Sequence, residues 1–585
     1  MNNIKYNIFR LILLTTIPII LGAAVALAEN NSDSPSNDFV INNTDTTATH
    51  LNEIKLRLSG NLYTGTYIYG SNGIEPHRTP FSAYVGGNIN LQIHKFNIPF
   101  SFIISEQDRS FQQPFNQFGL SPTYKWVTAH AGFRNLSYST YSLAGHTFLG
   151  AGIDLIPSKF RFSAMYGRFT RATSIDTIDN FISDPAFERT GYAVKIGIGS
   201  KTKYFDLIVL NVSDNPNSLN YDTSSFLITP AANLVTGFKT AQRIGKKFAL
   251  AAEYDISIYT NDIKLNDVIF SNSADLQKIQ KALDGIIIVN STTQLLSAGE
   301  MSLVFTEKNY SATIKYKRIS PEYKSMGAYF FLSDIQNLTL STNFKTWKKK
   351  IYFNGSIGLQ QDNLSQSHSL TNSYVIGSIA VSINPKPNYG MNLNYSNYST
   401  GQKAALMQLN DTAKIALISQ NLTLMPRYSY ISKKMIHTGV VVVSRQTLQD
   451  KNPFTAGLTE YNTKNLNISY NFTYLPYNGG LTLSYNSNIV INSINDTRFA
   501  GLSFGLNKTF LKNILNVYSN LTFNTTRLNG VASGKIKNVN LGGSYTIKKQ
   551  HKLSLSVATI NFNSTSDNVT SYSEITNNIT YTFIF

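Results

Sequence analysis

Alternation of apolar and polar residues runs through most of this chain, and it is clearest in the stretch Glu574–Phe585. One face of a strand here would hold Ile575, Ile579, Tyr581, Phe583 and Phe585, and the other would hold Glu574, Thr576, Asn578, Thr580 and Thr582. Successive side chains of a strand point to opposite faces. The stretch therefore predicts a strand with one apolar face and one polar face.

The same alternation recurs in Tyr310–Tyr316, Tyr389–Tyr395, Leu466–Tyr474 and Leu481–Ile491, each time with Asn, Ser, Thr, Lys or Gly opposite the apolar face. A soluble sandwich also alternates, but it seldom sustains the pattern over so many long segments. Charged residues make up only 14% of the chain, against about 25% in soluble domains. The pattern favours a closed all-β barrel with a lipid-facing outer surface and a polar interior.

Connections of two kinds alternate between the expected strands. Short ones, most of them with Lys, occur near Lys95, Pro157–Lys159, Lys201–Lys203, Gly245–Lys247, Glu307–Asn309, Lys348–Lys350, Asn384–Asn388, Ser432–Lys434, Lys512–Asn513 and Lys548–His551. Longer polar ones occur at Ser174–Glu188, Asp214–Ser225, Asn261–Gln294 and Gln449–Glu460. This asymmetry predicts an antiparallel up-and-down barrel with turns at one end and loops at the other.

Roughly 24–26 strands can be counted from Lys55 to the C-terminus, and an even number is expected of a single-chain bacterial barrel. Between Glu106 and His146, the alternation of short turns and long loops is out of step by one strand. This predicts a further crossing or an inserted segment, placed around Leu136–Leu143. The aromatic stretch 106–145 contains Pro114 and Pro122, and we expect it to fold into the lumen.

The N-terminal residues have the features of a secretory signal peptide. Lys5 and Arg10 precede the apolar run Leu11–Leu21, and Ala26-Leu27-Ala28 forms a small-residue cleavage site. Residues 29–50 are polar and predict a flexible lead-in, which leaves 51–585 for the barrel. Within the long connection 261–294, Ser273 and Gly285 bound a short amphipathic helix at Ala274–Asp284.

Alternation also places a basic and aromatic group of side chains on one part of the inner wall. Its members are Trp126, His130, Arg134, His146, Asp154, Arg161 and Arg171, with Tyr124 on the same face. Basic rings in a pore favour anions, so the group is a candidate constriction. The alternative is an internal ion-pair and packing network, in which Asp154 pairs with Arg134 or Arg161.

Signals for catalysis are absent. The eight His residues lack the spacing of a helical zinc motif, and the chain has no Cys. We expect no enzymatic activity, no metal and no cofactor.

Taken together, residues 51–585 resemble a large outer-membrane β-barrel of Gram-negative bacteria. The Asn/Lys/Ile-rich composition, with PFNQFGLSPTYKW at 114–126 and GHTFLGAGIDL at 145–155, is similar to barrels of the Bacteroidota type. The resemblance implies that Tyr581, Phe583 and Phe585 form the C-terminal signal for the barrel-assembly machinery. It also implies location in the outer membrane.

The expected function is a porin-like passage for polar or anionic solutes, narrowed by residues 106–145 and 261–294. The alternative is a non-conducting barrel subunit of a secretion, motility or surface-assembly complex. Outer-membrane lipids, the assembly machinery and other envelope proteins are the expected partners, and no nucleic acid is expected.

Overall fold

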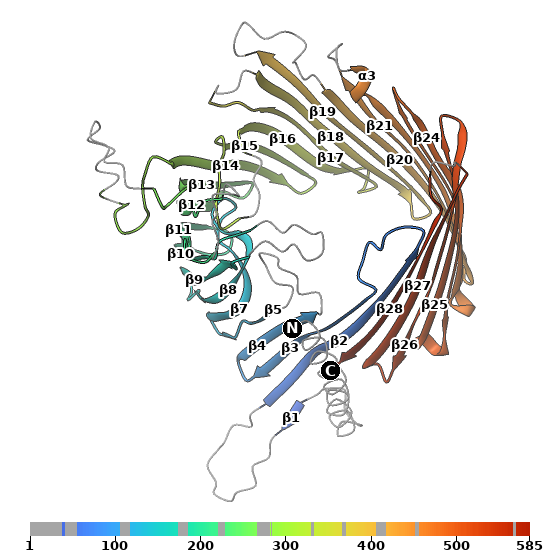
Figure 1. The fold of residues 1–585 in the computed structure, drawn as a ribbon, viewed down its shortest axis with the longest axis horizontal. Helices are drawn as coiled ribbons and strands as arrows, with labels where there is room; N and C mark the ends of the chain where they lie inside the picture. The colour runs from blue at the N-terminus through green and yellow to red at the C-terminus, as the bar shows by residue number, and fades with distance from the viewer. Residues whose placement is uncertain are drawn as a thin grey trace, which may run out of the picture.

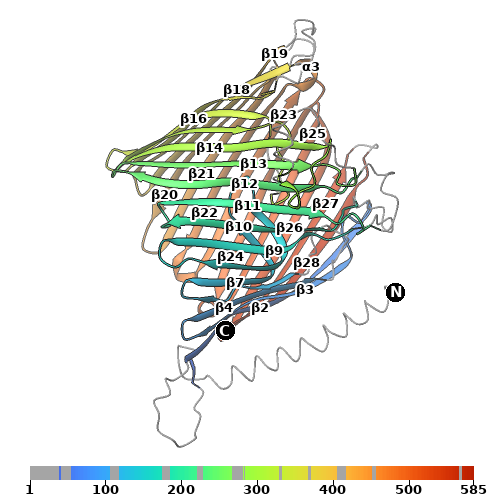
Figure 2. The same ribbon diagram turned by 90° about the vertical axis from the view of Figure 1, so that its left-hand side faces the viewer.

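The computed structural model describes residues 38–40, 55–105, 117–173, 185–219, 228–265, 281, 283–328, 333–365, 370–404, 417–450, 456–565 and 569–585. These residues form one antiparallel sheet (Figures 1 and 2). Among them, no helix combines the length and hydropathy needed to cross a bilayer.

The first half of the sheet runs through β1 Asp38–Val40, β2 Lys55–Asn72, β3 Phe81–Ile93, β4 Phe96–Ser105, β5 Gln117–Leu120, β6 Thr123–Tyr124, β7 Val127–Ser137, β8 Ala144–Leu155, β9 Phe160–Thr170, β10 Arg189–Gly199, β11 Tyr204–Asp214, β12 Ala232–Ile244, β13 Phe248–Thr260, β14 Thr293–Glu307 and β15 Tyr310–Ile319. The second half runs through β16 Ile335–Thr346, β17 Ile351–Gln361, β18 Leu370–Lys386, β19 Tyr389–Ala404, β20 Leu417–Ile431, β21 Met435–Asp450, β22 Tyr461–Tyr474, β23 Gly479–Asn492, β24 Asp496–Phe510, β25 Leu515–Leu528, β26 Val531–Ile547, β27 His551–Ser564 and β28 Tyr572–Ile584. The short helices are α3 Ala456–Thr459, η3 Leu475–Tyr477 and η4 Leu511–Asn513.

The sheet closes on itself because β28 pairs with β2 in an antiparallel register from Asn61↔Ile584 to Asn72↔Ser573. Backbone hydrogen bonds between Gly60 and Phe585 extend this seam to the last residue. The short β1 lies beside β2, while β5 and β6 together make one crossing between β4 and β7. The wall therefore has 26 strands, which confirms the predicted closed, even-numbered barrel.

The two ends of the barrel differ as the sequence predicts. At one end, hereafter the turn end, twelve connections have two to four residues each; ten lie at or beside the predicted short turns, and the two between β6 and β7 and between β22 and β23 were not predicted. Several of these turns have residues with positive φ, including Lys125, Lys348 and Lys549. At the other end, the loop end, the connections range from two residues between β25 and β26 to 32 between β13 and β14.

The additional crossing lies at Gln117–Tyr124 rather than at Leu136–Leu143, where it was predicted. Pro122 interrupts it, and its two pieces have four and two residues, so neither has the length of an alternating segment. A tight turn at Lys125-Trp126 follows. The register sets Tyr124 opposite Phe96, and their rings stack on the outer face at 4.9 Å, so the expected inward direction of Tyr124 is wrong.

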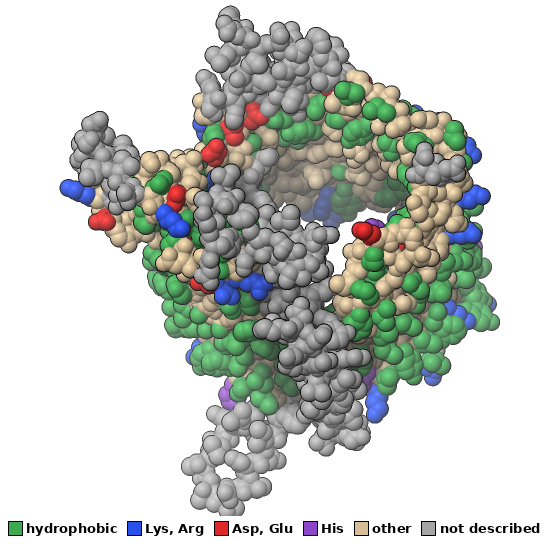
Figure 3. All heavy atoms as spheres, viewed as in Figure 1, with side chains coloured by type: hydrophobic (Ala, Val, Ile, Leu, Met, Phe, Trp, Pro, Cys, Tyr) green, Lys and Arg blue, Asp and Glu red, His purple; other side chains and the backbone are tan. Residues whose placement is uncertain are grey.

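The outer face is apolar over most of the wall, and Figure 3 shows hydrophobic side chains across much of the visible outer surface. Leu207, Leu295, Ile357 and Leu502 are each more than half exposed. Near the turn end this face has an aromatic girdle, made up of Phe96, Tyr124, Phe160, Phe205, Phe248, Phe305, Tyr310, Phe344, Phe353, Tyr389, Tyr428, Tyr474, Phe510, Tyr545 and Phe583. Barrels in lipid have such girdles at the membrane interface.

Candidate passage through the barrel

Charged side chains are distributed unevenly over the inner face. On β22–β26 this face consists mainly of Asn, Ser, Thr and Gly and has no charged side chain. On β7–β15 it holds eight Lys or Arg and six Asp or Glu, namely Arg134, Arg161, Arg189, Lys195, Lys239, Arg243, Lys315, Lys317, Asp154, Asp206, Asp214, Glu253, Asp255 and Glu300. The wall therefore has a neutral part and a charged part of nearly balanced sign.

Two connections from the loop end fold onto the charged part of the inner face and form a second layer there. This inner layer consists of residues 138–143, between β7 and β8, and residues 320–328, between β15 and β16. Tyr141 and Leu143 are fully buried, and Tyr323 is 3% exposed. The rest of the expected lumen insert that the structure describes, 117–137, belongs to the wall instead.

Hydrogen bonds join the two segments of the inner layer to each other. The Tyr323 hydroxyl donates to the carbonyl of Tyr141 at 2.7 Å, and the Ser325 hydroxyl donates to that of Ser142 at 2.6 Å. The Tyr141 and Tyr323 rings meet edge to face at 6.2 Å. A side chain at Gly327 would lie 2.5 Å from the Ser142 carbonyl oxygen and 2.7 Å from the Leu210 side chain, so only glycine fits this contact.

Further hydrogen bonds connect the inner layer to polar groups that the wall buries. The Ser139 hydroxyl donates to Asp255 at 2.9 Å, and the Tyr141 hydroxyl donates to Glu300 at 3.0 Å. Asn233 accepts from the backbone N–H of Met326 at 3.0 Å. Because buried polar groups are costly when unpaired, these bonds make the inner layer a fixed part of the wall.

Tyr141 and Tyr323 of the inner layer are held in their protonated form. Burial and the neighbouring Glu300 carboxylate raise the pKa of Tyr141 well above its usual range, and burial together with Asp255 raises that of Tyr323 in the same direction. Both hydroxyls consequently remain donors at any physiological pH.

Five salt bridges lie on the charged part, four of them between neighbouring strands and one, Arg161–Asp206, between β9 and β11 across β10. Arg161 binds Asp206 through two nitrogens at 2.7 and 2.9 Å, and Arg189 binds Asp214 in the same manner. The other three pairs, at 2.9–3.0 Å, are His130–Asp154, Lys239–Glu253 and Lys315–Glu300. Asp154 therefore pairs with His130, and neither Arg134 nor Arg161 is its partner as the alternative interpretation proposed.

The other residues that were predicted to form the constriction do not cluster with these ion pairs. The Nε of Arg134 donates to the carbonyl of Leu120 at 3.1 Å. His146 is 6% exposed and its ring lies 5.3 Å from that of Phe169, beneath the lumen surface. Trp126 lies in the turn between β6 and β7, and Arg171 directly follows β9.

Sequence reasoning missed Lys195, Asp206, Lys239, Glu253 and Glu300, although each lies at an inward position of an alternating strand.

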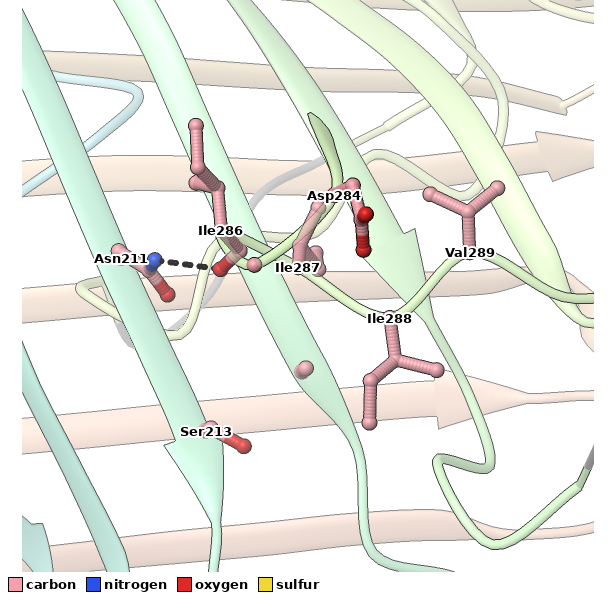
Figure 4. A pocket seen from close by; sticks show the side chains of 9 residues that line it. Asn211, Ser213, Asp284, Ile286, Ile287, Ile288 and Val289 are labelled. Atoms are coloured by element: carbon pink, nitrogen blue, oxygen red, sulfur yellow. Dashed lines mark hydrogen bonds between the residues drawn. The ribbon is translucent and has the colours of Figure 1, made fainter. Parts of the chain in front are cut away.

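The described end of the connection between β13 and β14 lies on the outside of the barrel. Residues 284–289 pack against outward residues of β11 and β12, where Asn211 donates to the carbonyl of Ile286 at 2.8 Å (Figure 4). Ile287 is buried with Ala232 and Leu234. The structure therefore gives no narrowing of the lumen by this part of 261–294. The predicted helix Ala274–Asp284 falls mostly outside the described residues.

In the described ranges, no group of three or more His, Asp or Glu side chains is arranged to hold a metal ion. No family model and no curated protein matches the chain.

Several solved structures align with most of the chain, but at low similarity. OccAB2 of Acinetobacter baumannii is 10% identical with a TM-score of 0.30, covering 90% of this chain and 98% of that one. The translocation pore of the P pilus usher PapC is 12% identical with a TM-score of 0.31, covering 91% and 99%. BauA, the ferric preacinetobactin receptor of Acinetobacter baumannii, is 9% identical with a TM-score of 0.36, covering 90% and 80%. These values give no basis for transferring a function.

Proposed function

We propose that this chain forms a passage for polar solutes across the outer membrane of a Gram-negative bacterium. The contrast between the outer and inner faces of the barrel supports this proposal best. The outer face is apolar and has an aromatic girdle, whereas the inner face of β22–β26 is neutral and polar. Figure 3 shows the molecule hollowed inside this wall. Closed barrels satisfy all backbone hydrogen bonds in lipid, and large ones enclose water.

The inner layer would form the fixed side of this passage, and the neutral strands would form the wetted side. Because six carboxylates offset most of the charge of the eight Lys and Arg on the charged part, we expect weak ion selectivity rather than strong anion preference. Solutes would then be selected mainly by size and by hydrogen bonding to Asn, Ser and Thr. The N-terminal signal and the C-terminal aromatic strand support delivery to the outer membrane by the barrel-assembly machinery.

Conductance of the purified protein in planar bilayers tests the proposal. We expect steady channel steps, and swelling of protein-containing liposomes in small neutral sugars. Gly327→Leu should change the step size, because the added side chain has no room beside Ser142 and Leu210. Gly457→Leu is the matched control, since no atom lies within 4 Å of the position of its Cβ.

A folded barrel that gives no steps and no swelling would overturn the passage. That outcome would favour the alternative function, a non-conducting subunit of a secretion, motility or surface-assembly complex. Co-purification of a fixed set of envelope proteins would then identify the complex.

A further inference from the structure

The outer face of β21–β26 has an unusual concentration of basic side chains near the loop end. Arg445, Lys464, Arg498 and Arg527 lie at outward positions of β21, β22, β24 and β25. Lys535 and Lys537 follow on β26. All six are exposed, and Figure 3 shows Lys and Arg side chains along the right-hand edge of the molecule, where Figure 1 labels β24 and β25. We call these six residues the basic row.

The strand register aligns four members of the row across the sheet. Arg445 is directly opposite Lys464, and Arg498 is directly opposite Arg527. Ile489 on β23 is paired with both Lys464 and Arg498, which joins the two halves. At about 4.8 Å between strands, the aligned part spans about 19 Å. Like charges directly opposite each other destabilise a sheet, so this alignment needs counter-charge.

The protein supplies little of that counter-charge in the part of the chain that the structure describes. Asp496 forms an ion pair with Arg498 at 2.7 Å, and Arg445 donates to the neutral Asn462 at 3.3 Å. Of the other cations at outward loop-end positions, Arg168 lies 3.8 Å from Glu188 and Arg318 donates to the neutral Gln336 at 3.1 Å. The row also lies beside two of the shortest loops, 493–495 and 529–530, which leave it open.

Apolar side chains continue directly from the row toward the turn end. Along the same outward face, Lys464 is followed by Leu466 and Ile468, and Arg498 is followed by Ala500 and Leu502. Ile468 and Leu502 are 45% and 63% exposed. A ligand that matches both surfaces has anionic groups for the row and hydrocarbon chains for the apolar strip below it.

We propose that the basic row binds the phosphates of a lipid headgroup in the outward leaflet, with the acyl chains along β22–β25. The width of the row fits a headgroup with two separated phosphates better than one with a single phosphate. Charge-assisted bonds from guanidinium and ammonium groups to phosphate are strong and favour this class. This inference rests on the proposed location in the outer membrane and goes beyond the proposed passage, because it concerns the opposite face of the wall.

The test is native mass spectrometry of the full-length protein with three added lipids. These are a diphosphorylated glucosamine lipid, its dephosphorylated form, and phosphatidylethanolamine. We expect preferential retention of the diphosphorylated lipid. Combined Arg445→Gln, Lys464→Gln, Arg498→Gln and Arg527→Gln should weaken its binding roughly thirty-fold, if each lost ion pair has the strength typical of an exposed one.

The control removes four basic residues at the turn end, with Lys201→Gln, Lys246→Gln, Lys349→Gln and Lys548→Gln, and should retain the wild-type affinity. Equal binding of the dephosphorylated lipid, equal losses in both variants, or no binding would overturn the inference. Both variants keep the inner wall, so bilayer conductance tests the passage separately. A silent protein that binds lipid through the row would overturn the passage alone.

Discussion

At the residue scale, the inner wall shows what strand alternation can and cannot predict. Alternation predicts the inward direction of His130, Asp154 and Arg161, and the register agrees for all three. Their partners depend on register and on strands separated by long connections. Arg161 pairs with Asp206, which lies two strands away across the glycine at position 197. Since that glycine has no side chain, the guanidinium can reach over β10.

The Arg161–Asp206 pair gives a prediction about selectivity. Asp206→Asn should shift the reversal potential in a salt gradient toward anion preference, because it leaves the Arg161 guanidinium uncompensated. Arg161→Gln should shift it toward cations for the converse reason. Each single change should also cost stability, at most about 3–5 kcal/mol for breaking a buried pair.

The double variant Arg161→Gln/Asp206→Asn is the control, since it removes both charges. Its reversal potential should return close to that of the wild type. Equal reversal potentials in all four proteins would contradict any contribution of this pair to the ionic environment of the passage.

At the element scale, the two ends of the chain meet in the seam between β2 and β28. Alternation in the sequence predicts the strand β28. It does not predict that β28 pairs with β2, nor which residues the aromatic rings of β28 contact. Phe583 is 5% exposed, although it lies on the outer face, because the rings of His551 and Phe585 lie 4.8 and 5.4 Å from its own. His551 also contacts the Tyr581 hydroxyl at 2.6 Å. The expected assembly signal is thus also a packed cluster at the seam.

Loss of the Phe583 ring should weaken this seam. We expect Phe583→Ala to destabilise the folded barrel by roughly 3–5 kcal/mol, the range for truncating a buried Phe to Ala. The loss should appear as a lower urea midpoint and a lower temperature for the gel-mobility shift of the folded form. Ile584→Ala is the control on the next residue, which is 49% exposed and should change stability little. Equal effects of the two changes would contradict a packing role for Phe583.

At the scale of the whole molecule, the sequence predicts the class, the even strand number and the two unlike ends. These features follow from period-two alternation and from turn residues that repeat along the chain. The inner layer was harder to predict. Its segments lie about 180 positions apart, and the hydrogen bonds between them, such as Tyr323 to Tyr141, have no local sequence signal.

The unlike ends predict an orientation in the membrane. A short epitope inserted between Asn529 and Gly530, at the loop end, should be labelled by antibody on intact cells, because loops face outward in outer-membrane barrels. The same epitope at Asn478, at the turn end, should be labelled only after the outer membrane is permeabilised. The opposite pattern, with both folded proteins present in the membrane fraction, would contradict the proposed orientation.

The inner layer also has a consequence for the order of assembly. Ser139 bonds to Asp255, 116 positions later, and Ser325 bonds to Ser142, 183 positions earlier. The ion pairs between neighbouring strands can form as each strand joins the sheet, since their partners are close in sequence. If the strands join the sheet from the N-terminus, the inner layer forms only after β13 and then β15 have joined, because its hydrogen-bond partners lie on or directly after those strands. In that order, a nascent barrel would have a wider lumen than the finished one, and this space would be lost only once half of the wall is in place.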